Sequence, residues 1–169
     1  MNITIDSSLE DGALIHHRNS YISNDSSQLS KIHNQKINIS IWQRKLDSEL
    51  MDIGNYLLRN NNEIQLSEVV EPRHTLDVLN KEFGSSKKTV PLFKDIYNLV
   101  NLFCNLFDEK RAWVRLDSID KPMCPRFHTD YVKCRLVTTY VGPATQWLPH
   151  ELVNRSKLGH GNQGQPDDK

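Results

Sequence analysis

The residues whose types and spacing point most directly to chemistry are a histidine and an aspartate two positions apart, His128 and Asp130. They stand at the head of FHTDYVKCRLVTTYV, residues 127–141, a β-branched and aromatic run typical of a strand. In a strand, residues two apart project from the same face, with their Cα atoms roughly 7 Å apart. The pair could therefore hold one ion, and one further histidine from another strand would complete the facial triad of non-haem iron oxygenases. The alternative is two surface or capping residues where a strand begins.

Two cysteines flank the pair and suggest a different site, a zinc centre in the pattern C-x3-H-x-D-x3-C formed with Cys124 and Cys134. Along a straight strand four residues span roughly 13 Å and six roughly 20 Å, too far for one tetrahedral ion. A bend at Pro125 could bring Cys124 closer, whereas Cys134 would stay remote. We therefore expect no four-ligand zinc site here.

Two further side chains of the same run could bind a cosubstrate. Arg135 could hold a carboxylate through two parallel hydrogen bonds, or it could form a structural salt bridge. Tyr140 could donate a hydrogen bond to a cosubstrate, or it could pack in a β-sheet as aromatic residues commonly do.

Hydrophobic periodicity predicts the elements that must position these residues. Apolar residues recur from Trp42 to Leu57 at helical spacing, and residues 73–83 form a second helix closed by Gly84. The segment Pro91 to Phe107 is apolar on two faces, which predicts a helix buried in the core. Helices followed by strands predict an α+β domain with a mainly antiparallel sheet. Its strands are expected at 37–41, 64–70, 111–119, 127–141 and from 145 onward.

The domain boundaries follow from changes in composition. Residues 1–36 are rich in Ser, Asn, Asp and His without a sustained period, which predicts a loosely ordered N-terminal arm. The α+β domain then spans residues 37–158, and residues 159–169 form a flexible polar tail or an interrupted loop. Few candidate strands surround the long one at 127–141. Either the early strands complete the sheet or the chain is truncated at its C-terminus, and we expect a fragment.

Composition excludes several classes of protein. The 21 basic residues balance 21 acidic ones, so no basic surplus points to a nucleic-acid or anionic-membrane partner. No apolar stretch reaches the roughly 20 residues that cross a bilayer, and the N-terminus does not have the pattern of a secretory signal. Three cysteines without a C-x-x-C spacing favour a reducing compartment. We therefore expect a cytoplasmic protein, whose small-molecule or protein substrate cannot be read from the sequence.

The segment FHTDYVKCRLVTTYVGPATQWLP resembles the first metal-binding strand of the iron(II)/2-oxoglutarate oxygenases of the prolyl-hydroxylase-like branch, in which H-x-D leads into R-x-[LV]-T-x-x-x-Y-[LV]. More closely, residues 125–149 resemble the bacterial domain-of-unknown-function family 1826, through C-P-x-F-H-x-D and R-L-V-x-T-Y-x-G-P-G-T-x-W-L-P. This resemblance covers residues 37–158. The residues that match the oxygenase pattern are His128, Asp130, Arg135, Leu136, Thr138 or Thr139, Tyr140 and Val141.

The resemblance implies a fold and an activity. The fold would be a cupin-like double-stranded β-helix with N-terminal helices packed on an antiparallel sheet. His128 and Asp130 would bind a metal ion, Fe(II), and Arg135 and Tyr140 would bind 2-oxoglutarate. The second hypothesis is a non-catalytic metal-binding or metal-homeostasis accessory protein, and the third is an inactive truncated copy.

The sequence departs from the family pattern in two places. Ala144 stands where the family has glycine, which restricts a turn. Family members also continue with a segment ending in H-R-S-P that could supply the third metal ligand. The histidines downstream in this chain, His150 and His160, do not lie in a strand-like context. The sequence thus predicts half of a metal site.

Overall fold

The predicted mixture of helices and strands is confirmed by a computed structural model that describes residues 1–6, 19–61, 63–121, 126–158, 161, 163 and 165. The fold class is α+β, because both helices and strands are present among the described residues. The chain divides into two compact units, which are described separately below. The described residues of the first unit lie within 1–6, 46–121 and 132–145, and those of the second within 19–45, 126–131 and 146–165.

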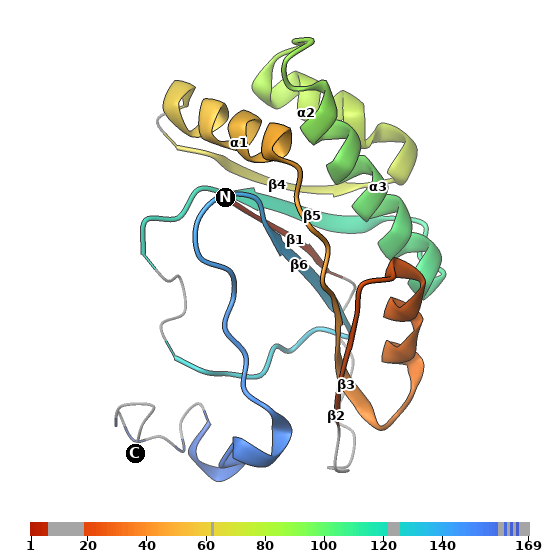
Figure 1. The fold of residues 1–169 in the computed structure, drawn as a ribbon, viewed down its shortest axis with the longest axis vertical. Helices are drawn as coiled ribbons and strands as arrows, with labels where there is room; N and C mark the ends of the chain where they lie inside the picture. Colours follow the sequence, from red (N-terminus) through yellow and green to blue (C-terminus); the bar gives the residue numbers. More distant parts are fainter. Residues whose placement is uncertain are drawn as a thin grey trace. The chain divides into compact units, whose positions relative to one another are not determined.

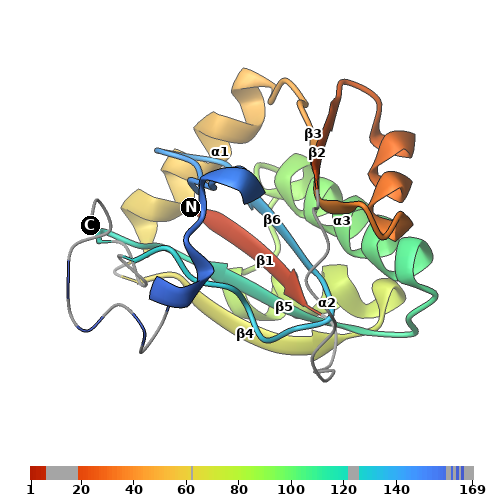
Figure 2. The same ribbon diagram turned by 90° about the horizontal axis from the view of Figure 1, so that it is seen from below.

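The first unit is built on a four-stranded antiparallel sheet in the order β4-β5-β1-β6 (Figures 1 and 2). Its strands are β1 (Asn2–Asp6), β4 (Gln65–Val70), β5 (Ala112–Asp117) and β6 (Arg135–Thr139). The prediction of a loosely ordered arm over residues 1–36 is therefore wrong for its first residues, because β1 is an inner strand between β5 and β6. Ile3 of β1 is fully buried, and this burial stabilises the strand.

Three α-helices cover one face of this sheet (Figure 1). They are α1 (Ser48–Asn60), α2 (Thr75–Phe83) and α3 (Val90–Phe107), and a short 3-10 turn, η2 (Pro72–His74), precedes α2. The second and third helices lie where the apolar spacing predicts them. The first begins later than predicted, because the Asp47 side chain accepts a hydrogen bond from the Glu49 N–H and caps the helix there.

Helix α3 forms the centre of the core. Pro91 occupies its first turn, where the missing N–H has no intrahelical acceptor to lose. The helix ends at Asp108, which adopts the left-handed conformation with φ 52°. Both predicted apolar faces are buried, through Leu92, Phe93, Ile96, Leu99, Val100, Phe103 and Cys104.

The second unit contains a parallel pair of strands, β2 (Asn19–Ser23) and β3 (Ile37–Trp42), joined by the 3-10 helix η1 (Ser26–His33). The predicted strand near 37–41 therefore exists, but it pairs with β2 and does not join the four-stranded sheet. Two short 3-10 turns follow, η3 (His150–Leu152) and η4 (Arg155–Lys157). The strand predicted from residue 145 does not form, since residues 143–149 have no regular structure.

Candidate metal centre

The strand that was predicted to carry the His-Asp pair is much shorter than residues 127–141. Strand β6 begins only at Arg135, and residues 127–134 have no regular secondary structure. Within the described residues β6 pairs with β1 alone, with Asn2 opposite Thr139 and Asp6 opposite Arg135. The prediction that strand geometry aligns His128 and Asp130 is wrong.

The two side chains nevertheless face each other. His128 Nε2 lies 3.3 Å from Asp130 Oδ1, and the side chains are 46% and 37% exposed. The other ring nitrogen, Nδ1, lies 2.8 Å from the backbone oxygen of Arg126. Because a carbonyl oxygen can only accept, Nδ1 donates this bond and carries the proton. In the neutral imidazole Nε2 then keeps its lone pair, the arrangement found in metal-binding histidines.

The spacing of the two donor atoms fits a shared ion. Nitrogen and carboxylate ligands bind zinc at about 2.0–2.2 Å, so two of them stand about 2.9 Å apart at a right angle and about 3.4 Å apart at the tetrahedral angle. The observed 3.3 Å lies within this range. The pair can therefore supply two neighbouring ligands of one divalent ion.

A third protein ligand is not found in the part of the chain that the structure describes. No three His, Cys, Asp or Glu side chains gather there in a way that could hold a metal ion. His150 lies in η3, and its Nδ1 is 3.0 Å from Nη2 of Arg155. Cys124 of the alternative zinc pattern, like His160, lies outside the described residues. Two donors are thus in place, from His128 and Asp130.

The two residues predicted to bind a cosubstrate belong to the first unit, whereas His128 and Asp130 belong to the second. Arg135 opens β6 opposite Asp6 of β1. Tyr140 is 1% exposed, its hydroxyl donates a hydrogen bond to the Asp95 carboxylate of α3, and its N–H donates to the Met1 carbonyl at 2.7 Å. The structure therefore places Tyr140 in the core, in the packing role that was its alternative interpretation.

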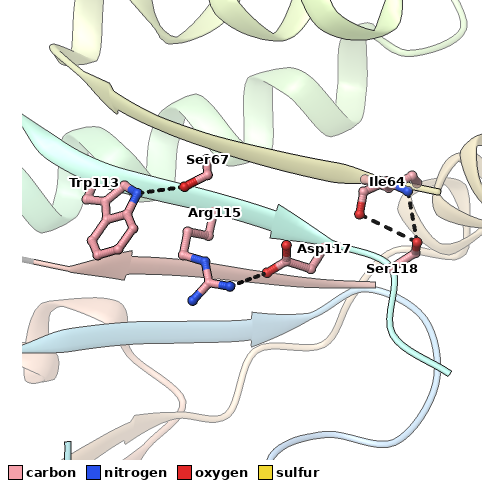
Figure 3. Close-up of polar contacts among 6 residues, drawn as sticks. All are labelled: Ile64, Ser67, Trp113, Arg115, Asp117 and Ser118. Carbon is pink, nitrogen blue, oxygen red and sulfur yellow. Dashed lines mark hydrogen bonds and ion pairs between the residues drawn. The ribbon is translucent and has the colours of Figure 1, made fainter. Parts of the chain in front are cut away.

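A second polar cluster, on β5, was missed by the sequence analysis (Figure 3). Arg115 Nη2 lies 3.5 Å from Asp117 Oδ2, and the Trp113 indole N–H donates to Ser67 Oγ at 2.9 Å. These side chains alternate with the buried Val114 and Leu116, so they project from the sheet face opposite the helices. The signal was present in A-W-V-R-L-D, where polar or amphipathic residues alternate with apolar ones.

Burial perturbs the Asp117 carboxyl of this cluster. Asp117 is only 7% exposed, and this burial raises the pKa of its carboxyl, an effect that the nearby Arg115 guanidinium opposes. Strand register places Asn2 opposite both Asp117 and Thr139. The buried atoms Asn2 Oδ1 and Thr139 Oγ1 have no hydrogen-bond partner among the described residues. A polar row thus crosses β5, β1 and β6.

Fold and site together define an α+β protein with a two-residue candidate metal site. The family model described as "Protein of unknown function (DUF1826)" matches residues 23–169, so the chain belongs to this family. No curated protein and no solved structure matches the chain. Within the described ranges, no helix is both long and apolar enough to pass through a membrane.

Proposed function

We propose that the protein binds a divalent metal ion through His128 Nε2 and Asp130 Oδ1. The observation that carries the proposal is the placement of these atoms, 3.3 Å apart, together with the hydrogen bond between Nδ1 and the Arg126 carbonyl. That hydrogen bond orients the ring and directs the Nε2 lone pair away from the backbone. The carboxylate offsets part of the charge of the ion.

The use proposed for this ion is a 2-oxoglutarate-dependent oxidation with Fe(II). Support comes from the resemblance of residues 127–149 to the first metal-binding strand of those oxygenases. Iron held on one side by three protein ligands has three open positions for an oxo-acid cosubstrate and O₂. Arg135 and Tyr140, which belong to the first unit, are proposed as cosubstrate-binding residues on the resemblance alone. The cupin-like double-stranded β-helix and the cytoplasmic location belong to the same proposal.

A second candidate function is metal binding without oxidation, as in a metal-homeostasis accessory protein. The exposure of the two donors favours it, because solvent reaches both side chains. An oxidising centre needs water to be excluded from the reacting groups. The hydrogen bond that the Tyr140 hydroxyl donates to Asp95 also favours metal binding without oxidation, since this hydroxyl is then not donated to a cosubstrate.

Metal analysis of anaerobically purified protein tests the proposal. We expect iron or another divalent metal in the wild type and its loss in both His128→Ala and Asp130→Ala. The chain offers a matched control, the exposed pair His74 and Asp77, whose Nδ1 and Oδ2 atoms are 3.6 Å apart. Substituting either control residue by alanine should leave the metal content unchanged.

Turnover of 2-oxoglutarate to succinate by the iron-loaded protein separates the two candidate functions. Succinate formation that disappears in both site variants supports the oxidation. A metal lost in these variants, without succinate from the wild type, supports binding alone. Metal content that is the same in the wild type, the site variants and the control variants would show that the pair is not the site.

A further inference from the structure

We infer that two copies of this chain share one metal ion, which is held by His128 and Asp130 of each copy. The inference rests on the metal binding proposed above and does not require the proposed oxidation. Its basis is a site with two donors, a spacing close to that of tetrahedral ligands, and a solvent-exposed segment.

The number of ligands is the first argument. Protein zinc sites have three or four protein ligands, and the described part of this chain gathers two. Most homodimers are related by a two-fold axis, and an ion on that axis sees every ligand twice. His128 and Asp130 thereby become two nitrogens and two oxygens, which is a complete four-ligand set.

The distance between the donor atoms is the second argument. Ligands at a right angle, as in an octahedral site, stand about 2.9 Å apart, and ligands at the tetrahedral angle about 3.4 Å apart. The observed 3.3 Å is closer to the tetrahedral value. One copy therefore spans one edge of a tetrahedron, and the opposite edge remains for the same two residues of a second copy.

The surface around the pair is the third argument. The four residues from His128 to Tyr131 are exposed, so a second copy can approach the donor atoms. The Tyr131 side chain is 89% exposed. Tyrosine is enriched at the energetic centres of protein interfaces, and burial of this ring would stabilise the paired state.

Charge does not oppose the pairing. The chain has a formal net charge of zero, so two copies do not repel each other at long range. The two carboxylates balance the charge of a divalent ion, and the two neutral imidazoles add none. Without the ion, the two carboxylates would face each other across the axis and repel, so pairing is expected to depend on metal.

A shared ion would also decide between the two candidate functions. Four protein ligands leave at most two positions of an octahedral ion open, whereas the oxidation needs three. The paired state is therefore suited to holding the ion and not to oxidation.

Zinc provides the test, because it is redox-inert and readily four-coordinate. The mass of the full chain in solution is measured by light scattering after gel filtration, with Zn²⁺ and then with EDTA, and bound zinc is counted. We expect a dimer with one zinc per two chains, which EDTA returns to monomers of 19.6 kDa. Bound Co²⁺ should show the intense visible absorption of a four-coordinate ion. His128→Ala and Asp130→Ala should abolish both the zinc and the dimer, and the His74→Ala and Asp77→Ala controls should retain them.

Three results would overturn the inference, and they separate it from the proposed binding. One zinc per monomeric wild-type chain, lost in the site variants, would leave metal binding intact and refute sharing. Absence of bound zinc from the wild type would refute both. A zinc-dependent dimer that persists in His128→Ala and Asp130→Ala would place the ion elsewhere. Circular dichroism checks that the variants fold. The ratio of zinc to chains in the wild type tests the sharing of the ion without relying on the variants.

Discussion

Replacement of Tyr140 by phenylalanine separates the two interpretations of this residue, structural and cosubstrate-binding. The substitution keeps the buried aromatic ring and removes the hydroxyl that donates to Asp95 in α3. If the hydroxyl serves the core, the substitution lowers the free energy of unfolding. If it serves a cosubstrate, activity falls while stability is unchanged.

The size of the expected loss follows from the surroundings of the bond. Hydrogen bonds to charged groups contribute about 1.5–3 kcal/mol to stability. Asp95 is half-buried, so water can replace part of the lost bond. We therefore expect Tyr140→Phe to destabilise the protein by about 1–2 kcal/mol, near the lower end of that range. Tyr140→Ala also empties a core position and should cost about 3–5 kcal/mol.

Urea unfolding followed by tryptophan fluorescence measures these losses, because Trp113 lies in β5, in the same sheet as strand β6, which directly precedes Tyr140. A double-mutant cycle with Asp95→Ala isolates the pair, and its coupling energy should be about 1 kcal/mol. A Tyr140→Phe loss below about 0.5 kcal/mol together with zero coupling would refute the hydrogen bond. Loss of 2-oxoglutarate turnover at unchanged stability would instead support the cosubstrate role.

Two further predictions concern titratable groups of the first unit. Burial raises the pKa of Asp117 above its ordinary 3.8, so the native state binds more protons than the unfolded state above that pH. This carboxyl therefore contributes stability that is lost as pH rises above 3.8, and Asp117→Asn should remove that contribution in urea titrations at a series of pH values; an unchanged slope would contradict the shift. Burial, and secondarily the Glu109 carboxylate, raise the pKa of the Cys104 thiol, and the residue is 3% exposed. Native Cys104 should therefore be alkylated by iodoacetamide far more slowly than in urea, as followed by mass spectrometry, and equal rates would contradict its burial.

Elements with strong periodicity could be predicted from the sequence, and short polar strands could not. The apolar spacing around Phe103 identifies α3, since a helix that is buried on two faces leaves a clear pattern. Strand β1, N-I-T-I-D, has only two apolar residues in a polar N-terminal region, and its place in the sheet depends on partners far along the chain. Local sequence does not encode such partners.

The candidate site was predicted for a reason that proved wrong. His128 and Asp130 were expected to align through strand geometry, because the run from Phe127 to Val141 is rich in strand-forming residues. Strand propensity alone does not make a strand, which also needs a partner, and among the described residues β1 pairs with residues 135–139. The side chains meet in an irregular segment instead, 3.3 Å apart. Whether they bind metal stays a prediction.

The position of β1 in the middle of the sheet sets the order of events during synthesis on the ribosome. Asn2–Asp6 precedes both of its neighbouring strands, β5 and β6, which are made much later. At roughly 5–20 residues per second the first strand waits on the order of ten seconds with its backbone unpaired. Unpaired strands of this kind are prone to associate with other chains. Helices α1 to α3 can form in the meantime from local contacts, so we expect the sheet to assemble last and nascent chains to gain from chaperone protection.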